Sequence, residues 1–173
     1  MQNYKMIFSV LLFGLVFSGC SHTVRITKKI KDSKSDYYTV TSDMFYAKPY
    51  SNEIPFEIYF QYSYEKEKLG DKFVFAVKFV NYTTTPRISS VKLSVDGYEQ
   101  NCKMDRFPVV QQEGVRGVSE TVFFRVPREL IEEMIATNKG YLDMEGFRRF
   151  SFFIPRDAIA VLSNFYDKVE GDN

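Results

Sequence analysis

The chain of 173 residues contains no tryptophan, one histidine and two cysteines. The histidine, His22, lies near the N-terminus, in a segment that we expect to be a tether. This position argues against a Ser-His-Asp triad, a Cys-His nucleophile pair and a zinc site built on histidines. The sequence also lacks a glycine-rich phosphate-binding loop. We therefore expect neither a metal site nor a cofactor.

An excess of positive charge is also missing, because 23 Lys and Arg residues are balanced by 22 Asp and Glu residues. Proteins that capture nucleic acid need clustered cations, which displace the counterions of the phosphate backbone. The balanced charge therefore argues against a nucleic-acid partner.

The apolar run near the N-terminus is too short to cross a bilayer, which takes roughly 20 residues. It extends from Met6 to Phe17, follows the cation Lys5 and precedes the small residues Ser18 and Gly19. A cation, a short apolar run and small residues are the three parts of a secretory signal.

The residues that end this signal, Phe17, Ser18, Gly19 and Cys20, resemble the lipobox of bacterial lipoprotein precursors. In that family an aliphatic residue and two small ones precede a cysteine that receives a diacylglyceryl group. The resemblance implies that the mature chain begins at Cys20 and is held on a membrane of the cell envelope, since two or more acyl chains give a stable anchor. Ser21 stands where Asp would favour the inner membrane, so the outer membrane is favoured.

Lipidation of Cys20 would leave Cys102 without an intramolecular disulfide partner. A lone cysteine of this kind is typically a small buried hydrophobic residue. We expect that role for Cys102.

The sequence predicts a signal peptide over 1–19, a lipidated tether and N-terminal segment with some strand content over 20–53, and a single β-rich domain over 54–173. The last segment is long enough to bury a hydrophobic core of its own.

Alternating apolar and polar residues predict the strands of this domain. The alternation runs over 54–64 and again over 73–80, and we expect these two strands to pair as a hairpin. Residues 91–95 and 98–103 form a second expected hairpin, because the Asp96-Gly97 pair between them suits a type I′ turn.

In the last third, a long loop is expected over 104–117. Two strands then run into amphipathic helices, each with a proline, Pro127 or Pro155, at its first position. Between these helices a hairpin over 141–154 turns at Gly146.

Seven strands joined mostly by hairpins favour a mainly β fold, an antiparallel immunoglobulin-like β-sandwich with two short helices in the C-terminal third. An α+β sheet with both helices on one face is the alternative. No Cys and Trp signature distinguishes the two.

Exposed tyrosines are the candidate contact residues for a ligand or a protein partner, since their rings anchor interfaces at low entropic cost. The candidates are Tyr37, Tyr38, Tyr46 and Tyr59. Tyr59 points away from the apolar face of its strand, and the other three lie in a segment with little periodicity. In the alternative interpretation, this segment wraps the sandwich and buries its rings.

A pair of carboxylates, Asp143 and Glu145, shares one face of an expected strand. Glycoside hydrolysis needs two carboxylates that flank a cleft. On an edge hairpin, such a pair is expected to be a solvated surface instead.

These patterns predict a membrane-anchored cell-envelope lipoprotein, a non-enzymatic binding or assembly module with an envelope protein as its possible partner. A small envelope hydrolase that uses carboxylates is one alternative, and it would need a polar cleft with a perturbed acid. A glycan-binding sandwich is another, and it would need coplanar exposed Tyr or Phe rings on one face.

The lipid anchor can be tested by a Cys20→Ser substitution in the full precursor. We expect the variant to lose labelling by a fatty-acid probe and to leave the membrane fraction, because the acyl chains provide the membrane affinity. Retention of both the label and the membrane association would contradict the anchor.

Overall fold

The computed structural model describes residues 25–30, 38–48, 55–66, 70–81, 83–114 and 117–171. The expected signal peptide, Cys20, His22 and Tyr37 lie outside these residues. The mainly β class and the two helices in the C-terminal third are confirmed, and the sheets are antiparallel.

The hairpin of β4 (Glu57–Lys66) and β5 (Lys72–Asn81) is the centre of the larger sheet. Alternate residues of β4 are fully buried, as the sequence predicts, and Phe60 lies opposite Val77 of β5. The predicted pairing of these two strands is therefore confirmed.

Further strands extend this sheet on both sides, in the order β1-β2-β4-β5-β9-β8. Strand β9 (Gly117–Val126) pairs with β5, and β8 (Met104–Glu113) forms the edge beyond it. On the other side lie β2 (Tyr38–Ser42) and the edge strand β1 (Ile26–Ile30). The segment expected as a tether thus contributes strands to the sheet.

A short strand, β3 (Phe45–Tyr46), also pairs with β4. It completes the seven-stranded sheet found in the described part of the chain.

The smaller sheet has the strand order β11-β10-β6-β7. Its strands are β6 (Ser90–Val95), β7 (Tyr98–Cys102), β10 (Tyr141–Glu145) and β11 (Arg149–Phe153). The predicted pairing of β6 with β7 and of β10 with β11 is confirmed. Between β6 and β7, Asp96 and Gly97 have φ angles of 44° and 90°, as a type I′ turn requires.

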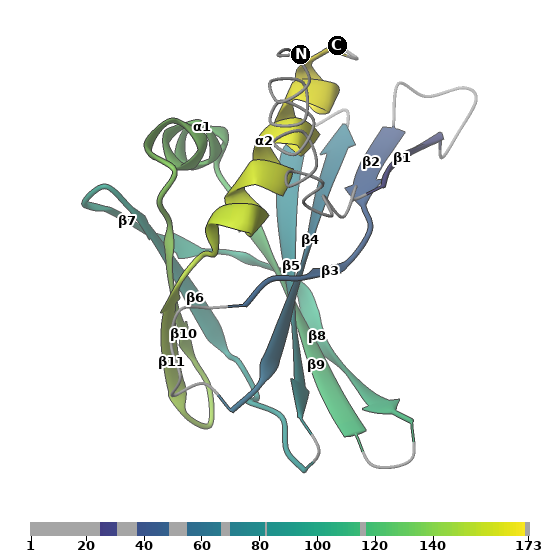
Figure 1. Cartoon of the computed structure of the whole chain (residues 1–173), viewed down its shortest axis with the longest axis vertical. Helices are drawn as coiled ribbons and strands as arrows, with labels where there is room; N and C mark the ends of the chain where they lie inside the picture. The colour runs from purple at the N-terminus through teal and green to yellow at the C-terminus, as the bar shows by residue number, and fades with distance from the viewer. Residues whose placement is uncertain are drawn as a thin grey trace, which may run out of the picture.

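The strands of the smaller sheet lie to the left of those of the larger sheet in Figure 1. Aromatic rings from the two sheets meet in one continuous core. The ring of Phe56 lies 5.3 Å from that of Phe150, and the ring of Phe60 lies 6.5 Å from that of Phe152. Each of these pairs joins the larger sheet, or the segment leading into it, to β11 of the smaller sheet.

Helix α1 (Arg128–Thr137) carries the chain from β9 of the larger sheet to β10 of the smaller one. Pro127 is its N-cap, one position before the first helical residue where the sequence had suggested it. Helix α2 (Arg156–Gly171) packs against β4, where the buried Tyr62 hydroxyl donates a hydrogen bond to the Ala158 carbonyl oxygen at 2.8 Å. In the described residues, neither helix is long and apolar enough to span a bilayer.

The expectation of a loop over 104–117 is wrong for most of its length, because residues 104–113 form β8. This strand pairs with β9 through two register shifts, which lie between Met104 and Arg106 and between Arg106 and Val109. Pro108 lies within the second shift. Bulges and proline interrupt the alternation by which a strand is recognised in a sequence.

A buried carboxylate fixes the connection between β5 and β6. Glu120 of β9 is 1% exposed and lies on the core side of its strand. Its two oxygens accept hydrogen bonds from the backbone N–H groups of Arg87 and Ile88, at 2.6 and 2.7 Å. Glu120 therefore ties this loop to the larger sheet.

Replacing Glu120 by Ala should destabilise the protein by about 2–4 kcal/mol, because two backbone N–H groups would lose their acceptor in a largely buried site. The free energy of unfolding from urea titration measures this loss. Glu129→Ala, at an exposed position in the first turn of α1, is the matched control, and its cost should stay below about 1 kcal/mol. Equal costs for the two variants would contradict the role of Glu120.

Candidate functional site

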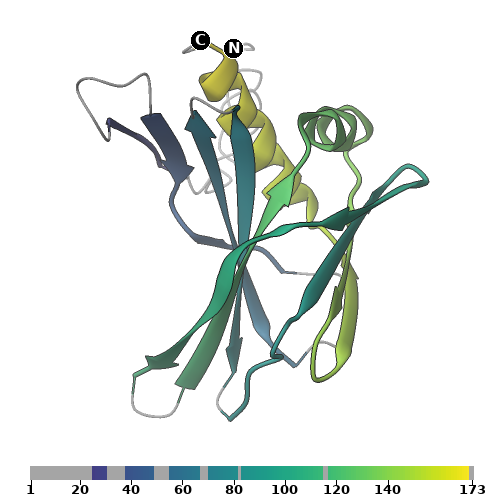
Figure 2. The same ribbon diagram turned by 180° about the vertical axis from the view of Figure 1, so that it is seen from behind.

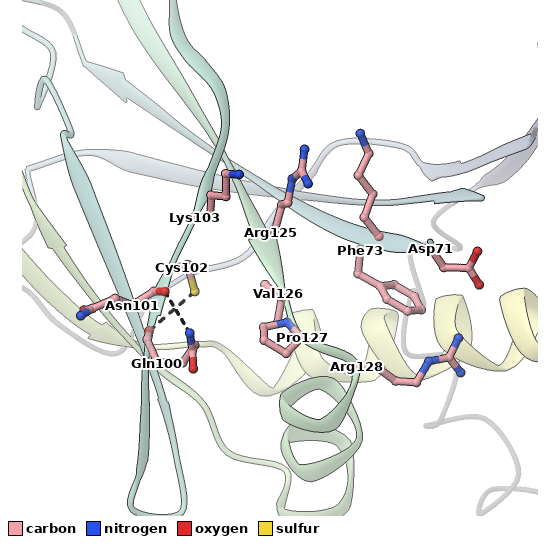
Figure 3. A pocket seen from close by; sticks show the side chains of 11 residues that line it. Asp71, Phe73, Gln100, Asn101, Cys102, Lys103, Arg125, Val126, Pro127 and Arg128 are labelled. Carbon is pink, nitrogen blue, oxygen red and sulfur yellow. Dashed lines mark hydrogen bonds between the residues drawn. The ribbon is translucent and has the colours of Figure 1, made fainter. Parts of the chain in front are cut away.

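A groove opens where the chain crosses from the smaller sheet to the larger one. Strand β7 ends at Cys102 and the chain continues into β8 from Met104 (Figure 2). At the crossing, the Arg125 N–H donates to the Lys103 carbonyl oxygen at 2.8 Å. The groove has a volume of about 330 Å³ and is bounded by β7, the start of β5, the end of β9 and the start of α1 (Figure 3).

The floor of the groove is apolar. Phe73, Cys102 and Val126 are each less than a tenth exposed, and Pro127 lies beside Val126 (Figure 3). Concave sites with an apolar floor and a few polar groups are typical of ligand binding.

The rim of the groove is cationic. The charged residues that line it are the cations Lys72, Lys103, Arg125 and Arg128 and the single carboxylate Asp71. Lys103 and Arg125 project on the same side of the strands, and Arg128 projects away from them (Figure 3).

Three of these cations have ion-pair partners outside the groove lining. Lys72 pairs with Glu65 at 2.8 Å, and Arg128 pairs with Glu170 of α2 at 2.5 Å. Arg125 uses its Nε to bind Asp105 of β8 at 2.9 Å.

Lys103 differs from the other three cations, since its ammonium group has no acceptor among the residues that the structure describes. Within the same residues, the terminal nitrogens of the Arg125 guanidinium also have no acceptor. Both groups can therefore donate to an incoming anion.

Cys102 lies in the groove as a free thiol, and the prediction of a buried cysteine is confirmed. Burial raises the pKa of the thiol to about 11. Because the thiolate is the nucleophilic form, the thiol is not activated for covalent chemistry near neutral pH.

The exposed edge of β8 begins next to the groove. Phe107 is 91% exposed, Val110 is 58% exposed and Val109 is 39% exposed. Strand β8 ends the strand order of the larger sheet, and no described strand pairs with its outer edge. Exposed apolar side chains along a free strand edge are typical of a site that pairs with another chain.

The predicted tyrosines are distributed over both faces of the larger sheet. Tyr46 and Tyr59 lie opposite each other on β3 and β4, with ring centres 5.5 Å apart on the outer face. Tyr38 packs instead on the buried Tyr64, with ring centres 5.7 Å apart. Tyr37 lies outside the described residues.

In the described part of the chain, two pairs of contacting rings include an exposed ring, and neither pair forms a flat platform. The rings of Tyr46 and Tyr59 meet at 62°, and those of Tyr141 and Phe153, on the smaller sheet, meet at 65°. Coplanar rings, which the glycan-binding alternative would use, are absent from these two pairs.

The expectation that Asp143 is solvated is wrong. Strand β10 lies inside the smaller sheet, and Asp143 is 8% exposed. It accepts hydrogen bonds from Arg149 and from the Ser151 hydroxyl, and these bonds lower the pKa of its carboxyl to about 2. Glu145 is exposed, as expected. Asp143 is therefore ionised near neutral pH and is committed to an ion pair.

The patterns in the sequence predicted neither the groove nor the edge of β8. The groove combines residues from β5, β7, β9 and α1, which are far apart in the chain. A local signal existed for β8, since Phe107, Val109 and Val110 are apolar residues in a stretch expected to be a loop.

In the described part of the chain, no group of three His, Cys, Asp or Glu side chains is placed to hold a metal ion. Comparison of the sequence with protein-family models and curated proteins, and of the fold with solved structures, finds no match. The site must therefore be interpreted from its own geometry.

The environment of Cys102 predicts slow alkylation. In the full Cys20→Ser chain at pH 8, a pKa of about 11 leaves only about one thiol in a thousand ionised. Iodoacetamide should therefore modify the native protein at least about a hundredfold more slowly than the protein in urea, as followed by mass spectrometry. Rapid modification of the native protein would contradict the buried, protonated thiol.

Proposed function

We propose that this protein is a lipid-anchored component of the bacterial cell envelope that acts as a binding or assembly module for another envelope protein. The observation that carries the proposal is the free edge of β8, with its exposed Phe107, Val109 and Val110, next to a cation-rimmed groove. The sequence adds the anchor through its lipobox and Cys20.

The strand order supports this arrangement, because β1 and β8 are the opposite edges of the larger sheet. Strand β1 is the described strand nearest in sequence to Cys20, and five strand-to-strand steps separate it from β8. At about 4.8 Å for each step, the two edges are roughly 24 Å apart. Lys168 of α2 holds the β1 side in place by donating to the Ile26 carbonyl oxygen at 3.2 Å.

The regular part of β8 is the part suited to strand addition. Residues 109–113 pair with β9 without interruption, whereas the register shifts and Pro108 lie before them. Bulges and proline protect a strand edge from indiscriminate pairing. A partner strand would thus add along 109–113, where main-chain hydrogen bonds provide affinity and side chains provide specificity.

The proposal includes the finer fold class, an immunoglobulin-like sandwich. Two antiparallel sheets that share one aromatic core, with most connections made by hairpins, support it. The α+β alternative with both helices on one face is less well supported, since α2 contacts β4 of the larger sheet whereas α1 contacts β6 of the smaller one.

The proposed function predicts a protein partner that depends on β8. In intact envelopes, chemical crosslinking of the acylated protein should recover a stoichiometric protein partner, identified by mass spectrometry. A Val109→Lys, Val110→Lys double variant should reduce that recovery at least about tenfold, because it places two charges in the contact. Circular dichroism must show that the double variant folds.

Tyr98→Lys provides the matched control, since Tyr98 is 70% exposed on β7 of the smaller sheet. Recovery of the partner should be unchanged in this variant. Equal recovery by the β8 variant, or recovery of lipid and glycan fragments alone, would contradict the proposed function.

A further inference from the structure

The groove combines two features that together specify a ligand. Its floor is formed by apolar residues, among them Phe73, Val126 and Pro127. On its rim, Lys103 and the terminal nitrogens of Arg125 have no acceptor among the described residues. A ligand that satisfies both features has an apolar group beside a negative charge.

The charged residues of the lining favour an anionic ligand. Carboxylates outside the lining pair with three of its four cations, and Lys103 is the cation that has no such partner among the described residues. A carboxylate that enters the groove can therefore pair with Lys103. Arg–carboxylate hydrogen bonds are charge-assisted and are about twice as strong as neutral ones. The amide side chain of Gln100, on β7, adds a donor and an acceptor of the kind that a peptide main chain uses.

The groove lies beside the start of β8. Lys103 directly precedes β8, and Asp105 of β8 holds Arg125 through its Nε. From Val109, where the regular part of β8 begins, to Lys103 is six residues, or about 20 Å of extended chain. An extended segment paired along β8 therefore reaches the groove with about six further residues.

We propose that the groove binds the acidic, apolar end of an extended peptide segment of the partner. The carboxylate accepts hydrogen bonds from Lys103 and Arg125, and the neighbouring apolar side chain packs on Phe73, Val126 and Pro127. This inference rests on the proposed function, because it names the chemistry of the segment that the partner presents. A C-terminal carboxylate and an Asp or Glu side chain supply the same group, and the test separates them.

The test uses the acylated full chain in detergent micelles and three fluorescein-labelled peptides, with binding measured by fluorescence anisotropy. The first is Ser-Val-Ser-Val-Ser-Leu with a free carboxylate, the second is its C-terminal amide, and the third is the amide with Glu before the leucine. A peptide with a carboxylate should bind at least about tenfold more tightly than the uncharged amide. If the site binds a C-terminal carboxylate, the first peptide should bind more tightly than the third. If it binds a side-chain carboxylate, the third should bind more tightly than the first.

Lys103→Gln should weaken the better acidic peptide about tenfold and leave the amide unchanged, since it removes one charge that no described contact of the fold uses. Lys139→Gln, at an exposed lysine after α1 that does not line the groove, is the control and should bind like the unmodified protein. Raising the salt concentration should weaken only the acidic peptides.

Equal affinity for the acidic and uncharged peptides, an unchanged affinity in Lys103→Gln, or no binding at millimolar concentration would overturn the inference. If the peptides fail while an envelope protein still crosslinks in a manner that depends on Val109 and Val110, only the groove inference falls. If that crosslink is also absent, the proposed function falls with it.

Discussion

Aromatic packing between the two sheets is the interaction on which the rest of the structure depends. Phe56 and Phe60, on or leading into the larger sheet, contact Phe150 and Phe152 of the smaller one, and the buried Tyr62 adds a hydrogen bond to α2. These contacts determine which face of each strand points inward, because side chains alternate between the two faces. Once the faces are set, the chain must cross between the sheets, and β7 continues into β8 at one such crossing.

The candidate site is a consequence of that crossing. Lys103 leaves the smaller sheet beside the end of β9, so the groove has the apolar core for its floor and the outward-facing Arg125 at its rim. The crossing also makes β8 an edge strand, whose apolar side chains no described strand covers. We propose that the segment resembling a lipobox holds one end of the protein on a membrane, and that the edge of β8 is available to a partner.

The local elements of the fold could be predicted from the sequence where alternation is regular, as in β4 and β5, or where one dipeptide suits one turn, as at Asp96-Gly97. Strand β8 could not be predicted from the sequence, because its register shifts and Pro108 remove the alternation of apolar and polar residues. The burial of Asp143 depends on Arg149, which lies on the neighbouring strand diagonally across from it, and a sequence does not show cross-strand register. The groove is formed by residues of four elements that are far apart in the chain, so no local sequence pattern indicates it.

The central claim is that the edge of β8 is covered by another protein in the envelope, and hydrogen exchange measures this most directly. The acylated protein should be exchanged in intact envelopes, and again after purification in micelles, with mass spectrometry of the peptides that contain residues 109–113. We expect slower exchange there in envelopes than in micelles, since strand addition protects main-chain N–H groups. Exchange of β11, at the edge of the smaller sheet, should be unchanged. Equal exchange of residues 109–113 in the two states would contradict a protein partner on β8.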